Sequence, residues 1–226
     1  MQRMGHFRDD ASRMTSLLIA TRNAHKVGEI RTILGDSFHY LTLNDVPAAP
    51  AVVEDANTFA GNASKKAMEL ATWLHSSKFQ TQNSKLFVLA DDSGLEVDAL
   101  GGQPGVHSAR FAALDKNENS TDAANRSKLL KELGNTPAAQ RTARFRCVIA
   151  LVEYNPQSAI RNPQLFDGTC EGRIISAERG KNGFGYDPLF VPDGFDQTFG
   201  ELSEDVKNKQ SHRAKALMKL KAALKP

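Results

Sequence analysis

The sequence predicts an α/β fold built around a mixed β-sheet. Short apolar runs, typical of buried strands, alternate along the chain with segments whose apolar residues recur at helical spacing. One longer segment, Ala143–Tyr154, alternates apolar and polar residues as a half-buried strand does, and Gln164–Glu178 has the pattern of its partner. We therefore expect some neighbouring strands to be antiparallel and others parallel.

The first half of the chain contains three predicted strands and two predicted helices. The strands are Ser16–Thr21, His39–Leu43 and Leu86–Ala90. Asn23 is placed to cap a helix that ends at Leu34, just before Gly35. A longer helix is expected from Thr58 to Leu74. It should bury one face, made of Phe59, Ala63, Ala67, Leu70 and Leu74.

The second half adds two predicted helices to the long strand pair. Thr121–Leu133 has helical spacing, with Thr121 as its cap and Gly134 as its stop. The segment Ser211–Lys225 is amphipathic, and its expected inward residues are Ala214, Leu217, Met218 and Leu224. We expect residues 1–14 to form a disordered extension and residues 15–226 to form a single domain.

Composition excludes several classes of protein. The 29 basic and 26 acidic residues give a net charge of only +3, which makes no case for a nucleic-acid partner. No apolar run approaches the length of a membrane span, and the N-terminus lacks the apolar core of a secretory signal. Cys147 and Cys170 are expected to be buried, reduced thiols. These features predict a cytoplasmic protein without a membrane partner.

The segment Thr21–Lys26 lies between a predicted strand and a predicted helix. Backbone N–H groups and the helix dipole favour an anion at such a junction. Thr21 and Asn23 can donate hydrogen bonds, and Lys26 adds a positive charge. The glycine spacing of a P-loop is absent, so a capped turn with a solvated lysine is the alternative interpretation.

Acidic residues stand at two points where a metal could bind. Asp91 and Asp92 directly follow an apolar strand, and burying adjacent carboxylates is costly unless a cation accompanies them. Glu54 and Asp55 precede a helix, where acids usually complement the dipole but could also reach Mg²⁺ across a cleft. Lys66 lies on the helix that follows.

Two later segments could recognise a flat, anionic ligand. In Gly180–Phe190, glycines surround Phe184 and so leave room for a base to stack, although such rings often form core corners instead. In Val206–Arg213, basic residues gather before the last helix, where they oppose its dipole. A bound anion or an acidic neighbour is expected there.

Taken in order, these motifs resemble the inosine/xanthosine triphosphate pyrophosphatase family, also called HAM1-like. The matching stretches are TRNAHK, E…TF..NA..KA, ADDSGLEVDALGG.PG..SAR, GFGYDP and SHR, between Ser16 and Leu224. The resemblance implies an elongated, two-lobed fold around a long mixed sheet flanked by helices, and a homodimer. It also implies Mg²⁺-dependent hydrolysis of non-standard purine nucleoside triphosphates (ITP, dITP and XTP) to the monophosphate and pyrophosphate.

The resemblance also assigns roles to residues. Asp92 is implied as the catalytic proton acceptor, with Asp91 as a helper, and Glu54 and Asp92 as metal ligands. Arg22 stands where the family commonly has glycine. The implied substrate-binding residues are Thr21, Arg22, Asn23, Ala24, His25, Lys26, Lys66, Ser93, Phe184, Gly185, Tyr186, Asp187, Lys207, His212 and Arg213.

The sequence also predicts a basis for selecting the base. Lys207 and Arg213 can only donate hydrogen bonds, so they favour a 6-oxo purine over adenine, whose amine is a donor. Two alternative functions stay open at this point. One is a pyrophosphatase for other modified nucleotides, such as methylated or halogenated pyrimidines. The other is a nucleotide-binding module without turnover.

Overall fold

A six-stranded mixed sheet forms the centre of the structure, a computed structural model that describes residues 14–77, 79, 85–114 and 119–224. The sheet order is β2-β1-β3-β4-β5-β6. The strands are β1 (Thr15–Ile19), β2 (Phe38–Thr42), β3 (Leu86–Val97), β4 (Thr142–Tyr154), β5 (Gln164–Ile174) and β6 (Phe190–Pro192). β1 pairs in parallel with β2 and β3, and every later pair is antiparallel, which confirms the predicted mixed sheet.

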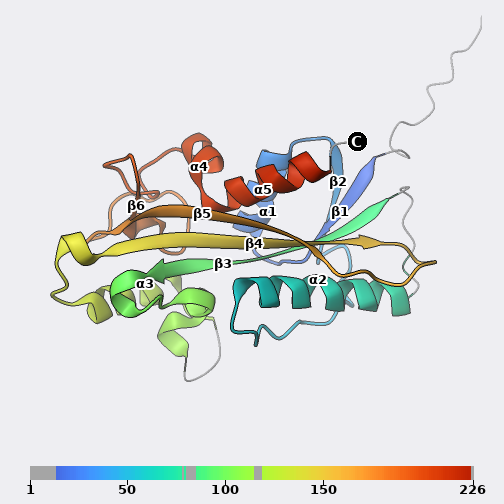
Figure 1. Ribbon diagram of the computed structural model, residues 1–226, viewed down its shortest axis with the longest axis horizontal. Helices are drawn as coiled ribbons and strands as arrows, with labels where there is room; N and C mark the ends of the chain where they lie inside the picture. Colours follow the sequence, from blue (N-terminus) through green and yellow to red (C-terminus); the bar gives the residue numbers. More distant parts are fainter. Residues whose placement is uncertain (1–13, 78, 80–84, 115–118, 225–226) are drawn as a thin grey trace, which may run out of the picture.

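Helices cover both faces of this sheet (Figure 1). They are α1 (Ala24–Leu34), α2 (Phe59–Ser76), α3 (Asp122–Leu133), α4 (Glu204–Gln210) and α5 (His212–Ala223). Figure 1 places α2 and α3 on one face and α1, α4 and α5 on the other, with the long axis of the molecule along β4. Short 3₁₀ segments are η2 (Asp98–Leu100), η3 (Gly105–Ala113), η4 (Ala138–Gln140) and η5 (Asp187–Leu189).

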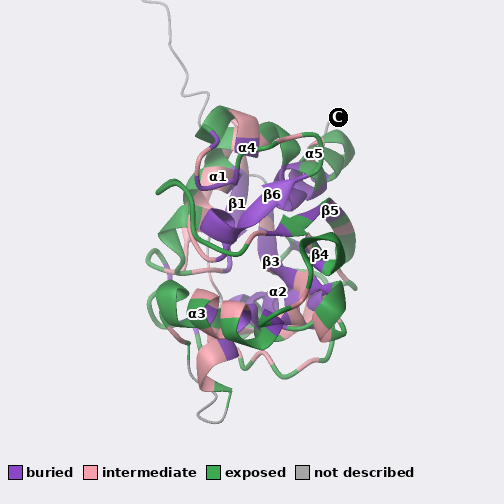
Figure 2. Cartoon of the chain, turned by 90° about the vertical axis from the view of Figure 1, so that its left-hand side faces the viewer, coloured by how far each residue is buried: buried purple, intermediate pink, exposed green. Residues whose placement is uncertain are grey.

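Successive strand residues point to opposite faces, so the middle strands contribute side chains to two hydrophobic cores, one on each face of the sheet. Val88 and Ala90 pack with α2, whereas Leu89 packs with α1 and α5. A third cluster, around Phe145 and Phe190, fills the far end of the sheet. In Figure 2 the strands are largely purple, as expected of a sheet covered on both sides.

β3 is longer than the sequence predicted. The prediction ended the strand at Ala90 and placed Asp91 and Asp92 just beyond it, but pairing with β4 continues to Val97. The prediction was wrong because acids normally avoid buried strands, and here cations from distant segments neutralise them. Gly94 also lies within the strand. A Cβ at Gly94 would overlap the η3 backbone, so glycine allows η3 to cross closely over β3.

The predicted helix starts are confirmed, because caps depend on nearby residues. Asn23, Thr58 and Thr121 each accept a hydrogen bond from the first turn of α1, α2 and α3. The inward face of α5 was partly wrong: Met218 is 58% exposed, and Leu220 is buried instead. β5 also ends earlier than predicted, at Ile174.

Two predicted segments lie partly or mostly outside the described residues. The proposed N-terminal extension lies outside the described residues except for Met14, and Lys225 of the predicted last helix also lies outside them. Across the described ranges, none of the helices combines the length and the apolar content that crossing a membrane requires.

Candidate active site

A cleft of about 450 Å³ lies beside the middle of β3 and collects most of the predicted site residues. Its lining comes from α1, α2, β3, η3, α3, β4, α4 and the start of α5, and from the loops before α2 and η5. The predicted residues that line it are Thr21, Arg22, Asn23, Lys26, Glu54, Lys66, Asp92, Ser93, Phe184, Gly185, Tyr186, Asp187, Lys207, His212 and Arg213. Ala24 and His25 instead line a smaller neighbouring cavity of about 270 Å³.

Asp91 points to the side of the sheet that α1 and α5 cover. Its Oδ1 lies 3.1 Å from Lys26 Nζ, and its Oδ2 lies 3.0 Å from the Arg213 guanidinium. Burial alone would raise the pKa of this carboxyl, but the charges of Lys26 and Arg213 hold the pKa far below its usual range. Asp91 is therefore a permanent anion that fixes two cations at the cleft.

Asp92 points to the opposite side, toward α2, because neighbouring strand residues alternate. Asn62 Nδ2 donates to its Oδ2 at 3.0 Å, and the Ser93 N–H donates to its Oδ1 at 3.0 Å. Burial raises the pKa of Asp92 to about 6, although Lys66 works in the other direction. Two adjacent carboxyls thus have pKa values shifted in opposite directions, and only Asp92 is close to exchanging a proton near neutral pH.

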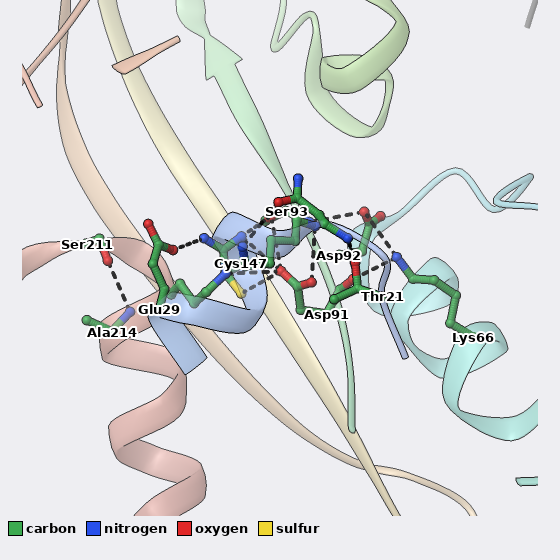
Figure 3. Close-up of polar contacts among 12 residues, drawn as sticks. Thr21, Glu29, Lys66, Asp91, Asp92, Ser93, Cys147, Ser211 and Ala214 are labelled. Carbon is green, nitrogen blue, oxygen red and sulfur yellow. Dashed lines mark hydrogen bonds and ion pairs between the residues drawn. The ribbon is translucent and has the colours of Figure 1, made fainter. Parts of the chain in front are cut away.

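Glu54 and Asp92 meet at a single lysine. Lys66 Nζ lies 2.9 Å from Glu54 Oε2 and 3.8 Å from Asp92 Oδ1, and it donates to the Asp91 carbonyl at 2.7 Å. Figure 3 shows Lys66 and Glu29 approaching the Asp91–Ser93 segment from opposite sides. α2 supplies both Asn62 and Lys66 from one face, since the two residues are four positions apart.

This donor set fits a magnesium ion that is shared with a ligand. Mg²⁺ in proteins takes one or two carboxylates and completes its shell with water and substrate phosphates. Glu54 and Asp92, converging on one ammonium group, form such a pair. In the described part of the chain no cluster of three or more His, Cys, Asp or Glu side chains could hold a metal alone. An ion bound here would need oxygens from the ligand or from water.

Glu29, on α1, is a site residue that the sequence analysis missed. Its carboxylate pairs with Lys207 Nζ at 2.9 Å and with the Arg213 guanidinium. Burial opposes its ionisation, but Arg213 and Lys207 lower its pKa overall. The sequence held one local signal, since Glu29 lies three residues after Lys26 and so shares its helix face, but its partners are far away in the chain. Glu29 is the acidic neighbour that the basic segment required.

Phe184 lies among cations and a second ring. Lys207 Nζ is 4.5 Å from the centre of its ring, and His25 stacks against it with 5.3 Å between centroids. The loop around Phe184 is shaped by Gly183, which has a φ of 74° and where a Cβ would overlap the Asp187 carboxylate. That carboxylate accepts from the Phe184 N–H at 2.8 Å and from Lys207 Nζ at 2.7 Å.

His212 is buried at the same end of the cleft and stacks on Phe145 with 4.9 Å between ring centres. Burial, followed by the charges of Arg213 and Lys207, keeps the pKa of His212 well below its usual value. Its Nδ1 atom is buried, and within the described residues nothing hydrogen-bonds to it. His212 is therefore a neutral ring packed on Phe145, beside the cations Lys207 and Arg213.

Arg110 also lines the cleft. Its guanidinium donates to the Glu54 backbone carbonyl at 3.1 Å. Arg110 therefore links η3 to the loop that carries Glu54.

The fold and the cleft define an α/β protein whose site joins fixed ammonium and guanidinium groups to a pair of carboxylates, an arrangement suited to a metal-bound polyphosphate. The chain belongs to the Ham1 family, whose sequence model matches residues 17–223.

Similar proteins are known from both sequence and structure. A dITP/XTP pyrophosphatase of Shouchella clausii is 44% identical over 93% of this chain and 97% of its own length. A dITP/XTP pyrophosphatase of Desulforamulus reducens is 46% identical over 90% of this chain and 92% of its own length. The Ham1 protein structure from Staphylococcus aureus superimposes with a TM-score of 0.74 at 37% identity, covering 92% of this chain and 97% of that one.

Proposed function

We propose that this protein hydrolyses non-standard purine nucleoside triphosphates, such as ITP, dITP and XTP, to the monophosphate and pyrophosphate. The relatives named dITP/XTP pyrophosphatase match nearly its whole length. The observation that carries the proposal is the convergence of Glu54 and Asp92 on Lys66, together with the raised pKa of Asp92, about 6, which suits a general base.

The phosphate end of the cleft would lie between α1 and α2. Lys26 and Lys66 stabilise negative charge on the phosphates, and Thr21, Arg22 and Asn23 surround them at the start of α1. Glu54 and Asp92 would hold Mg²⁺ together with phosphate oxygens and water. When bound, the ion supplies positive charge that polarises those oxygens.

Asp92 accepts the proton of the attacking water. Asn62 holds its Oδ2 by a hydrogen bond, which leaves Oδ1 toward Lys66. Attack at the α-phosphorus releases pyrophosphate as the leaving group and leaves the monophosphate. Lys66 stabilises the charge that develops on the phosphates during this step.

The base end of the cleft would select a 6-oxo purine. Lys207 has three N–H donors, of which two go to Asp187 and Glu29, so one remains for an acceptor on the base. Adenine would present an amine donor to the same cations, and unmatched buried donors give strong rejection. Phe184 stacks on the ring. Guanine also has a 6-oxo group, so its 2-amino group must be excluded by shape or by an unpaired polar contact.

The proposed enzyme is a cytoplasmic homodimer without nucleic-acid or membrane partners. The resemblance of the motifs supports the dimer, and the near-neutral net charge of +3 supports the lack of a nucleic-acid partner. Size-exclusion chromatography with light scattering tests the dimer, since a monomer at micromolar concentration would contradict it.

A nucleotide panel with and without Mg²⁺ tests the proposed reaction. We expect ITP, dITP and XTP to be hydrolysed far faster than ATP or GTP, with pyrophosphate rather than orthophosphate as product. Faster hydrolysis of modified pyrimidine triphosphates would favour the first alternative. Tight nucleotide binding without any pyrophosphate would favour the second.

The variant Asp92→Asn tests the role of this carboxylate. It should keep the fold but lower kcat about 10²- to 10⁴-fold, because the amide cannot accept the proton. The matched control is Asp167→Asn, since Asp167 is an exposed acid paired with Lys219 on the surface. Near-wild-type turnover by Asp92→Asn would remove Asp92 from the mechanism.

A further inference from the structure

The loop that carries Phe184 is held from both faces of the sheet. On the side of α1 and α4, Asp187 binds Lys207, and Phe184 stacks on His25. On the side of α3, the Tyr186 hydroxyl donates to the Ser108 carbonyl of η3 at 2.9 Å. Figure 2 shows α1 and α4 at one end of this view and α3 at the other.

Helix α3 holds the backbone of this loop directly. The Gly185 N–H donates to Asp122 Oδ2 at 2.7 Å, and the Gly185 carbonyl accepts from the Arg126 guanidinium at 2.8 Å. Asp122 and Arg126 are four residues apart, so they project from one face of the helix. Both backbone polar groups of the residue after Phe184 are therefore bound by charged side chains, which form the stronger class of hydrogen bond.

Arg126 also makes a second attachment to the same region. Its Nε forms an ion pair with Glu178 at 2.9 Å, and the Arg126 side chain is largely buried. One guanidinium thus joins α3 to two points of the segment that follows β5, at Glu178 and Gly185. The charged face of α3 therefore contacts the segment from Glu178 to Gly185, and sequence periodicity alone would not indicate this contact.

We propose that Asp122 and Arg126 are positioning residues that set the Phe184 ring at the base end of the cleft. This inference rests on the proposed function, in which Phe184 stacks on the purine. Without the two side chains, the Gly185 backbone has fewer restraints and the ring samples more positions. Nucleotide binding then has to order the loop, which weakens affinity. The chemical step is largely spared, because Asp92 and Lys66 belong to β3 and α2.

The test combines Arg126→Ala and Phe184→Ala, alone and together, with ITP as substrate. Arg126→Ala should raise KM about 3- to 10-fold, the effect of one or two lost hydrogen bonds, and change kcat less than about twofold. In the Phe184→Ala background the same change should add little, because the ring through which Arg126 acts is gone. A full additional rise in KM in the double variant would overturn the inference.

Conservative variants separate positioning from a loss of stability. Asp122→Asn keeps an acceptor oxygen for the Gly185 N–H, so its KM should stay near wild type, whereas Asp122→Ala should raise KM. Lys131→Ala is the control, because Lys131 is an exposed cation on the same helix. A melting temperature for each variant shows whether the fold is intact. Equal KM values for Asp122→Ala and Asp122→Asn would contradict the inference.

Hydrogen–deuterium exchange measures the loop without any substrate. The amides of residues 184–187 should exchange faster in Arg126→Ala than in wild type or Lys131→Ala. Unchanged exchange together with unchanged KM would refute the positioning role while leaving the proposed function intact. Absence of pyrophosphate release by the wild-type protein would refute the proposed function, and the exchange rates would still decide whether α3 holds the loop.

Discussion

At the scale of single residues, the direction of a side chain separates two acids that are neighbours in the chain. Asp91 meets Lys26 and Arg213 on one side of the sheet, and Asp92 meets Asn62 and Lys66 on the other. The pKa of Asp91 is lowered and that of Asp92 is raised to about 6. One acid can therefore anchor cations while the other exchanges a proton.

His212 gives a prediction about the pH dependence of stability. Its folded-state pKa is lowered by burial and by Arg213 and Lys207, so the folded protein binds fewer protons than the unfolded chain once the pH is below about 6.5. Protonation then favours the unfolded chain, and stability is lost as the pH falls. In His212→Gln this loss should be smaller, by at most about 1.4 kcal/mol per pH unit.

Urea unfolding at several pH values between 5 and 8 measures this effect. Other groups titrate in the same range, so the quantity to compare is the difference in slope between the variant and the wild type. Identical slopes would show that the His212 pKa is not depressed in the folded state.

At the scale of elements, α2 couples the Asp92 carboxylate to the protein core. Asn62 is fully buried, donates to Asp92, and accepts from the Ala56 N–H at 2.9 Å. Asn62→Ala should cost about 1–3 kcal/mol, because it leaves buried polar groups without partners. It should also lower kcat, since Asp92 loses the bond that holds Oδ2.

Denaturant unfolding and steady-state kinetics with ITP check this prediction. Glu69→Ala is the control, as it removes an exposed polar side chain from the same helix. A stable Asn62→Ala variant with unchanged kcat would show that α2 does not orient Asp92.

The elements that the sequence predicted well are those fixed by neighbouring residues. Asn23 and Thr121 cap their helices through bonds that span three residues, so the local pattern contains the cause. The end of β3 was missed because Asp91 is neutralised by Lys26 and Arg213, which are far away in the chain. Glu29 was missed for the same reason: its partners Lys207 and Arg213 come from the other end of the sequence.

At the scale of the whole molecule, the cleft depends on how closely α5 packs on the sheet. α5 begins at His212, and its first residues bring His212 and Arg213 to the cleft. Gly168 of β5 lies directly beneath this start. A Cβ there would overlap the His212 carbonyl and lie 2.6 Å from the Ala216 nitrogen. The absence of a side chain at Gly168 therefore fixes the distance between β5 and α5.

Gly168→Ala tests this dependence. The added methyl group should push α5 away from β5, at a cost of about 1–3 kcal/mol from overpacking. Because His212 and Arg213 move with the helix, KM for ITP should rise as stability falls. The matched control is Gly28→Ala at an exposed position of α1, where an added Cβ meets no atom within 4 Å and should stabilise the helix by about 0.5–1 kcal/mol. If urea unfolding and KM of Gly168→Ala both matched wild type, the position of α5 would not depend on this contact, and the base end of the cleft would need another support.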